Sequence, residues 1–360
     1  MATNAANRFG QDYAADAAAL GRPVTPIIDV HSHINGAAAS KIFARAAELY
    51  GVERIYSMSR LADLEAVRAA LGDRIRFIAI PDFRAEDKAH AFGRGYLDHI
   101  RQCHDAGARM TKFWVAPRGR DFTDELGGEH VLSLDSPLAR KAMDLSAELG
   151  MMFMTHVADP DTWFQTSYVD ASKYGTKREQ YEPLERVLEA YPVPWIAAHM
   201  GGWPEDLHFL TDLLARHDNL YLDASACKWM VREISQQPRE ELVEFMTKHR
   251  GRIMFGSDIV TMDDHLQASE DGNEMNTKAS SDQEAFDLYA SRYWALRTMW
   301  ETDHVGESPI ADPDLHMVDP DRFTPMDAPK LVGKSMPEDI LRSFYHDAAH
   351  TLVDAWYDKA

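Results

Sequence analysis

Short apolar runs alternate with stretches of helical periodicity from Pro26 to about Trp300. Runs of this length that are apolar throughout are typical of strands buried on both faces of a parallel sheet. Turn signals and polar residues follow each of them. The predicted strands are Ile27–His31, Arg54–Met58, Ile75–Ile80, Met110–Val115, Met151–Thr155, Trp195–Ala198, Leu220–Asp223 and Ile253–Phe255.

The segments between these strands place apolar residues on one helical face, and several end at a glycine, a common helix stop. Ser136 followed by Pro137 is a typical helix start, because serine caps free N–H groups and proline suits the first turn. The predicted helices are Ala38–Tyr50, Leu61–Leu71, Lys88–Ala106, Pro137–Leu149, Tyr181–Tyr191, Pro204–Arg216, Glu240–His249 and Glu284–Trp300.

Eight strands separated by helices predict a (β/α)8 TIM barrel, since eight parallel strands close such a sheet. An open doubly wound sheet is the alternative, but no Gly-x-Gly-x-x-Gly follows the first strand. We expect a lead-in over residues 1–25, the metal-dependent barrel over 26–300 and a C-terminal extension over 301–360. The extension would end in a helix over Pro337–Tyr357 that packs on the barrel, with Ser335 as its cap.

The composition limits the classes of partner. With 58 acidic and 38 basic residues the formal charge is −20, which disfavours nucleic acid and anionic membrane surfaces. Two cysteines supply no disulfide framework. The start of the chain has no signal-peptide pattern, and no apolar run is long enough to span a bilayer. We expect a cytoplasmic protein that acts on a small molecule, and the sequence is compatible with a homo-oligomer.

His31 and His33 end the first predicted strand, separated by one serine. Alternate side chains of a strand point the same way, so both imidazoles would share one face. Imidazoles so placed can bind one divalent metal ion. With 16 histidines in 360 residues, roughly 0.7 such pairs (16 × 16/360) are expected by chance, so the interpretation depends on the other strands.

Three other strands end in matching residues: His156 after the fifth, His199 after the sixth and Asp258 after the eighth. In a barrel the carboxyl ends of the strands meet at the face where active sites are built. Chance would scatter these side chains over helices and loops. The set therefore predicts a metal site at that face.

These motifs resemble the amidohydrolase superfamily: His31-x-His33, the strand-five His156, Ala-Ala-His199-Met-Gly-Gly and Phe-Gly-Ser-Asp258. The residues of these motifs are most similar to those of the amidohydrolase-related branch, which includes aminocarboxymuconate-semialdehyde decarboxylase. The stretch from Met336 to Ala349 also resembles that branch, and the likeness runs from about residue 26 to 357. The branch contains hydrolases, lactonases, hydratases and decarboxylases, so the motifs specify little about the substrate.

The resemblance implies that His31, His33, His156 and Asp258 bind one catalytic divalent metal, with zinc favoured. It implies that His199 is a general acid/base or polarises a carbonyl. Independently of the family, a metal held by such ligands with one open position acidifies a bound water, and a carboxylate such as Asp258 can accept its proton. Asp29, two residues before His31, is expected to support the site.

Lys112, in the fourth strand, has three interpretations. The resemblance offers a carbamylated lysine that bridges a second metal, as in binuclear members of the superfamily. The preferred interpretation is a lysine that binds substrate or shapes the site, and the third is an inert ion pair. One metal is therefore favoured over two.

Residues in the loops after the strands are candidates for substrate binding. Arg118 follows the fourth strand and could hold an anion, although an exposed loop arginine often has no such role. Trp163, Phe164 and Tyr168 would either wall a pocket or form a small core within their own loop. Trp203 lies just after His199. The stretch 259–283 is acidic and suits a lid or a solvated excursion.

Three functions follow. The leading one is a metal-dependent hydrolase in which activated water attacks an ester, lactone or amide carbonyl. The alternative is a non-oxidative decarboxylase of an aromatic or dienoic acid, which a cationic pair such as Lys112 with Arg118 would favour. A barrel that binds a ligand without turnover is a minor alternative, because every expected position of the site is filled.

Overall fold

The computed structural model describes residues 4–82, 85–126, 133–268 and 278–359. The chain divides into two compact units, each built from two stretches of sequence. The first unit contains residues 1–76 and 224–351, and the second contains residues 77–223 and 352–360.

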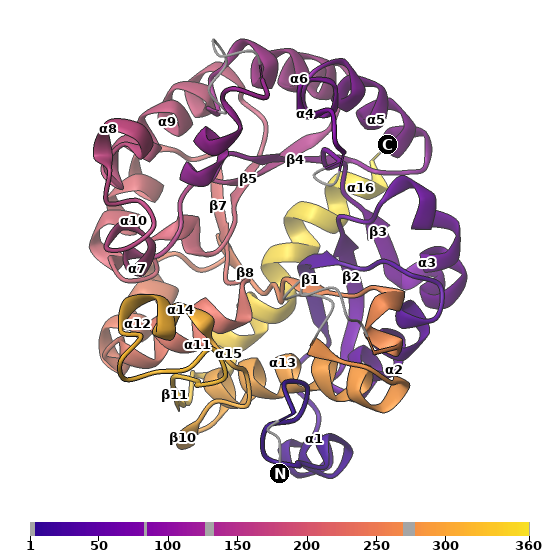
Figure 1. Cartoon of the computed structure of the whole chain (residues 1–360), viewed down its shortest axis with the longest axis vertical. Helices are drawn as coiled ribbons and strands as arrows, with labels where there is room; N and C mark the ends of the chain where they lie inside the picture. Colours follow the sequence, from indigo (N-terminus) through magenta and orange to yellow (C-terminus); the bar gives the residue numbers. More distant parts are fainter. Residues whose placement is uncertain (1–3, 83–84, 127–132, 269–277, 360) are drawn as a thin grey trace. The chain divides into compact units, whose positions relative to one another are not determined.

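The first unit is centred on β1 (Ile27–His33), which lies between β2 (Val52–Ser57) and β9 (Ile259–Val260) and runs parallel to both. Figure 1 shows β1 beside β2. Nearly every residue of β1 is buried, as expected of a parallel strand covered on both faces. Two further short strands are β3 (Ile75–Phe77), at the division between the units, and β8 (Ile253–Met254).

Helices surround these strands, and α13, the longest described helix, packs along α2 through aromatic side chains. Phe43 of α2 contacts Tyr289 and Tyr293 of α13 with ring centroids 6.2 and 6.1 Å apart. The helices of the first unit up to residue 301 are α1 (Tyr13–Leu20), α2 (Ala39–Leu49), η1 (Leu61–Asp63), α3 (Leu64–Leu71), η2 (Gly72–Arg74), α11 (Cys227–Gln236), α12 (Arg239–Lys248), η6 (Asp263–Leu266) and α13 (Asp282–Glu301).

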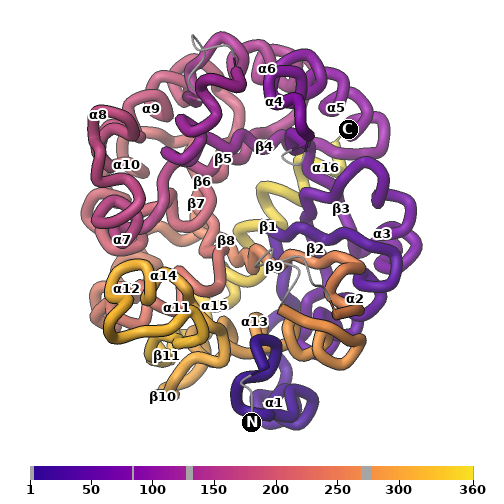
Figure 2. The backbone as a smooth tube through the Cα atoms, in the orientation of Figure 1, coloured from indigo at the N-terminus to yellow at the C-terminus, as the bar shows by residue number. Residues whose placement is uncertain are grey.

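The second unit contains β4 (Met110–Trp114), β5 (Met152–His156), β6 (Trp195–Ala197) and β7 (Leu220–Asp223), which pair in that order, all parallel. Figure 2 shows β5, β6 and β7 side by side. Its helices are α4 (Lys88–Phe92), α5 (Arg94–Asp105), η3 (Pro117–Phe122), α6 (Pro137–Glu148), α7 (Asp161–Phe164), α8 (Ala171–Tyr174), η4 (Arg178–Gln180), α9 (Tyr181–Ala190), η5 (Met200–Gly202), α10 (Leu207–Arg216) and α16 (Ala355–Asp358).

The extension after α13 is ordered. It contains α14 (Pro313–Val318) and the antiparallel pair β10 (Val305–Glu307) and β11 (Lys330–Val332). Buried ion pairs from Arg232 of α11 to Asp312 and Asp314 hold α14 in place. The chain then continues as α15 (Glu338–Arg342) and the π-helical segments Ser343–Asp347 and His350–Asp354.

The predicted fold class is confirmed, because parallel strands alternate with helices as in the (β/α)8 class and a helical segment ends the chain. Ser136 caps α6 as predicted, accepting the Ala139 N–H. The cap predicted at Ser335 is wrong. Its φ is +41° and the helix begins after Pro337, so the serine lies outside the first turn.

Two helices also differ from prediction. The helix expected over Lys88–Ala106 breaks at Gly93 into α4 and α5, and α11 was not predicted at all. Of the acidic stretch 259–283, residues 269–277 lie outside the described residues, while Ile259 and Val260 form β9.

Candidate metal centre

Three of the predicted ligands converge in the first unit, at the end of β1. The Nε2 atoms of His31 and His33 lie 3.4 and 3.3 Å from Oδ1 of Asp258. The His31 side chain is fully buried, whereas those of His33 and Asp258 are 23% and 27% exposed. The group therefore has one closed side, formed by His31, and one side open to solvent.

The Phe-Gly-Ser-Asp sequence explains how the aspartate reaches this position. Asp258 has φ +57°, a left-handed conformation that a residue other than glycine adopts at an energetic cost. The N–H groups of Ser257 and Asp258 both donate to the His31 carbonyl, at 3.2 and 2.7 Å. Gly256 allows this approach, because a Cβ there would lie 2.9 Å from the Cβ atoms of His31 and Ser225.

Buried polar groups hold the histidine end of β1. Asp29 accepts hydrogen bonds from the His31 N–H (3.2 Å), the Ser257 N–H (3.0 Å) and the Tyr293 hydroxyl (2.9 Å). Burial raises the pKa of Asp29 to about 6, against the opposing effect of these hydrogen bonds. Asp29 thus connects β1 to the turn that carries Asp258, and so it supports both chain segments that carry these side chains.

Ser225 orients the deepest ligand. Its Oγ lies 3.1 Å from Nδ1 of His31, while Nε2 of the same ring faces Asp258. With the hydrogen on Nδ1, that nitrogen donates to Ser225 and Nε2 keeps its lone pair for a metal. The hydroxyl can therefore accept the hydrogen bond made by the tautomer that a metal ligand needs.

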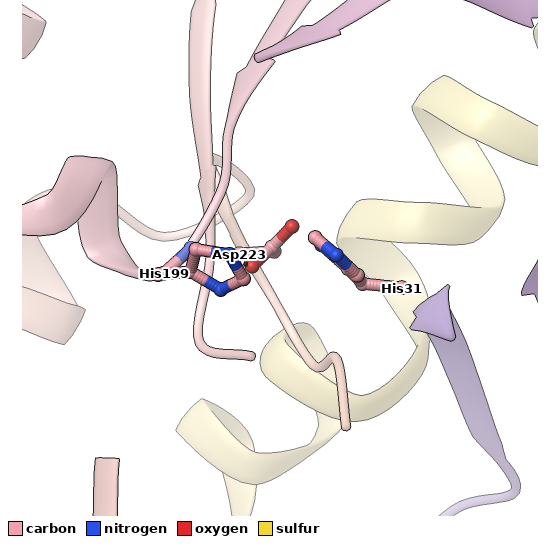
Figure 3. Close-up of side chains that lie close together, drawn as sticks. All are labelled: His31, His199 and Asp223. Carbon is pink, nitrogen blue, oxygen red and sulfur yellow. Dashed lines mark hydrogen bonds between the residues drawn. The ribbon is translucent and has the colours of Figure 1, made fainter. Parts of the chain in front are cut away.

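In the second unit, His156 ends β5 and His199 follows β6. Their ring centroids lie 4.7 Å apart, with the rings nearly perpendicular. His199 has φ +59°, and its N–H donates to Oδ1 of Asp223 at 2.9 Å. Figure 3 shows Asp223 beside His199. The pairing of these two predicted residues thus depends on β5, β6 and β7 ending side by side.

His156 has a partner that the sequence did not reveal. Nε2 of its ring lies 2.7 Å from Oδ1 of Asp159, and the hydroxyl of Tyr168 donates to Oδ2 of the same carboxyl at 2.5 Å. All three side chains are buried. A signal was present in the sequence, an acidic residue three positions after a strand-end histidine, but no periodic pattern singled it out.

Lys112 is buried on β4, where it pairs in register with Met154, two residues before the Trp114–His156 pair. Since side chains alternate along a strand, Lys112 shares the sheet face of His156. Arg118 is exposed, beyond the end of β4. The structure thus places a buried lysine on the histidine face and an exposed arginine in η3, which follows β4.

The candidate aromatic residues pack on one another. Trp163 lies 5.6 Å from Tyr168 between ring centroids, and Phe164 lies 5.3 Å from it. Trp203 stacks on Tyr181 at 5.8 Å. Trp163 and Trp203 stay half-buried. The loop after β5 therefore forms its own small core, one of the two outcomes expected from its sequence.

The donor set of the first unit suits a divalent metal. Two imidazole nitrogens and a carboxylate oxygen lie within 4.8 Å of one another, and zinc, iron and manganese all accept such ligands. The separations of 3.4 and 3.3 Å between the carboxylate oxygen and the two imidazole nitrogens are short enough for one ion to contact all three atoms. Two of the three side chains already reach solvent, so an ion could enter without opening the core.

The amidohydrolase family model matches residues 46–354 of the chain. The chain belongs to the amidohydrolase family. This is a family of metal-dependent enzymes. The match contains His156, His199 and Asp258, whereas His31 and His33 precede it, so their part in the site rests on the geometry above.

Solved structures give distant similarities to this amidohydrolase. One is a probable 2-pyrone-4,6-dicarboxylic acid hydrolase from Acinetobacter baumannii (10% identity, TM-score 0.42, 74% of this chain and 92% of that chain). Another is 2,6-dihydroxybenzoate decarboxylase from Rhizobium (12%, 0.41, 76% and 99%). A third is N-acetyl-D-glucosamine-6-phosphate deacetylase from Mycobacterium smegmatis (11%, 0.43, 91% and 78%). No curated protein matches the sequence significantly.

No helix among the described residues combines the length and the apolar character needed to cross a membrane.

Proposed function

We propose that this amidohydrolase is a metal-dependent hydrolase that cleaves an ester, lactone or amide bond of a small molecule. The observation that carries the proposal is the convergence of His31, His33 and Asp258 at one solvent-accessible point. Hydrolysis needs both a metal position and a base at the open side of it, and Asp258 is the ligand that can supply the base.

The ligands in this proposal are His31, His33, His156 and Asp258, holding one divalent ion, with zinc favoured. When bound, such an ion would polarise a carbonyl oxygen and lower the pKa of water to about 7. With the hydrogen of His31 on Nδ1, the Ser225 hydroxyl would accept it and Nε2 would be available to the ion. The partly exposed Asp258 faces the side from which water and substrate arrive.

Asp258 and His199 carry the proton chemistry. Asp258 accepts a proton from the attacking water at its carboxylate and returns it to the departing oxygen or nitrogen. The His199 ring stabilises the negative charge that develops on the carbonyl oxygen. The hydrogen bond from the His199 N–H to Asp223 fixes the backbone that carries this ring.

Substitution of Asp258 by Asn tests the mechanism, combined with elemental analysis of the purified protein. We expect about one divalent metal per chain, and turnover reduced by at least about 100-fold in D258N, since an amide cannot take up the proton. Asp303→Asn, an exposed aspartate of the same unit, is the matched control and should leave the rate unchanged. An undiminished rate in D258N would rule out the mechanism.

Decarboxylation is the second candidate, because Lys112 is a buried cation on the sheet face of His156. A cation in that position suits the carboxylate of an aromatic or dienoic acid. A panel of lactones, amides and aromatic acids separates the two reactions when water addition and carbon dioxide release are scored independently. Carbon dioxide release without hydrolysis would replace the leading proposal by this one.

One metal is proposed rather than two. A second ion bridged by carbamylated Lys112 predicts two metals per chain and an added carbon dioxide mass on a peptide containing this lysine. Intact-protein mass spectrometry with metal analysis distinguishes the two cases.

A further inference from the structure

We propose that Asp159 is a positioning residue that selects the ring nitrogen through which His156 binds the metal. Its carboxylate accepts the hydrogen of Nε2, which leaves Nδ1 as the ligand atom. This inference rests on the proposed function, in which His156 is a metal ligand.

The geometry of the pair carries the proposal. Oδ1 of Asp159 lies 2.7 Å from Nε2 of His156, and the two residues are only 3% and 7% exposed. Competition from water is weak at such a site, so the hydrogen bond is strong and its direction is set by the two partners. A neutral imidazole carries one N–H, and a metal needs the nitrogen without it.

Tyr168 contacts the second oxygen of the Asp159 carboxylate, so that both oxygens accept a hydrogen bond. Its hydroxyl donates to Oδ2 at 2.5 Å. Burial raises the pKa of Tyr168 above its usual range and Asp159 adds to the effect, while Arg118 opposes it, so the phenol keeps its hydrogen. Because Oδ2 already accepts the Tyr168 hydroxyl, Oδ1 is the carboxylate oxygen that faces the imidazole and accepts its N–H.

Further contacts in the loop after β5 hold the backbone next to Asp159. Lys177, which is 7% exposed, pairs with Asp161 at 2.7 Å and with Glu205 at 3.5 Å. Oε1 of Glu205 also accepts the Asp161 N–H at 2.6 Å. Asp161 follows Asp159 by two residues, so these contacts fix the backbone that carries the carboxylate. The acceptor is thus oriented before any ion binds.

Partners of this kind influence metal affinity by about 10- to 100-fold when they are removed. The expected cause here is the tautomer. Without an acceptor at Nε2, the hydrogen is shared between the two ring nitrogens, and the fraction of protein with a usable Nδ1 falls. The ring also gains freedom to rotate about its Cβ–Cγ bond.

The test uses the full chain labelled with ¹⁵N at histidine, free of metal and loaded with zinc, with His156→Asn to assign the signals. In the wild-type protein we expect Nε2 of His156 to stay protonated in both states, while zinc shifts the signal of Nδ1. In Asp159→Asn, which keeps the shape but can also donate, we expect mixed tautomers and a zinc dissociation constant about 10- to 100-fold higher. Asp159→Ala should act in the same direction.

Asp144→Asn is the matched control, because Asp144 accepts a Tyr191 hydroxyl at 2.7 Å in the same unit without contacting a described histidine. It should change neither the dissociation constant nor the His156 signals. Wild-type affinity and tautomer in D159N would overturn the inference, and so would zinc shifting Nε2 instead of Nδ1, which would make Asp159 or Nε2 the ligand. If D159A fails to fold, D159N alone decides.

The readouts separate this inference from the proposed function. A zinc-loaded protein that shows the expected tautomer but hydrolyses nothing would contradict the hydrolase proposal and leave the role of Asp159 intact. A protein that hydrolyses its substrate but keeps its zinc affinity in D159N would support the hydrolase proposal and contradict the role of Asp159.

Discussion

Replacement of Gly256 by alanine is a test of how the metal centre is built. This glycine lies in the turn between β8 and Asp258, close to β1. A Cβ added there would lie 2.9 Å from the Cβ atoms of both His31 and Ser225, and 3.6 Å from the Ser225 Cα. Those neighbours are bound directly to backbone, so neither can rotate away.

The size of the effect follows from these distances. Ordinary contacts begin at 3.4 Å, so β1 or the turn must move by roughly half an ångström, a shift that a preorganised site tolerates poorly. Overpacking of this kind costs about 1–3 kcal/mol of folding stability. The same displacement moves His31 away from Ser225 and from Asp258, so the metal dissociation constant should rise about 10- to 100-fold.

Urea unfolding measures the stability of the variant, and competition with a chelator measures its zinc affinity. Gly251→Ala is the control, since it has φ +83° but no atom within 4 Å of the added Cβ. It should lose about 1–2 kcal/mol through backbone strain and keep its zinc affinity. If G256A binds zinc as tightly as the wild type, the close packing of the turn against β1 is not what positions His31.

Three further predictions use other contacts. Ser225→Ala removes the partner of His31 Nδ1 and should raise the zinc dissociation constant about tenfold with little change in urea unfolding, whereas an unchanged constant would contradict the tautomer argument. Ser136→Ala removes the cap of α6 and should cost about 1 kcal/mol in urea unfolding, without affecting zinc binding. Burial, with Arg252 and Lys248, lowers the pKa of His249 to about 4. The unfolded chain therefore binds this proton below about pH 6.5 and the folded protein only near pH 4. The free energy of unfolding should thus decrease as the pH is lowered through that window. His249→Asn should lose less stability there, as followed by urea titration at several pH values.

The strand order and the strand-end residues were predictable because they depend on local pattern. Apolar runs bounded by turn residues identified all eight strands from β1 to β8, and the observed ends differ from prediction by a few residues. His31, His33 and Asp258 lie together because two of them alternate along β1 and the third directly precedes β9, which pairs with β1.

Helix α11 was missed for a physical reason. Arg232 and Glu233 are buried in it, where Arg232 forms ion pairs with Glu233, Asp312 and Asp314. Buried charges disrupt the apolar stripe by which an amphipathic helix is recognised. Its first residue follows Ala226, which has φ +66° and no capping side chain, so the start signal was absent as well.

The sequence by itself determined the α/β class, the family motifs and which residues stand at the strand ends, since these follow from the two-residue period of strands and from residue type. Only the tertiary structure decided which nitrogen and which oxygen face one another. Ser225 lies 194 residues from His31 in the chain, and Asp159 reaches His156 because a loop core orients it. Such contacts depend on loop conformation and on close packing at Gly256, and neither produces a periodic pattern in the sequence.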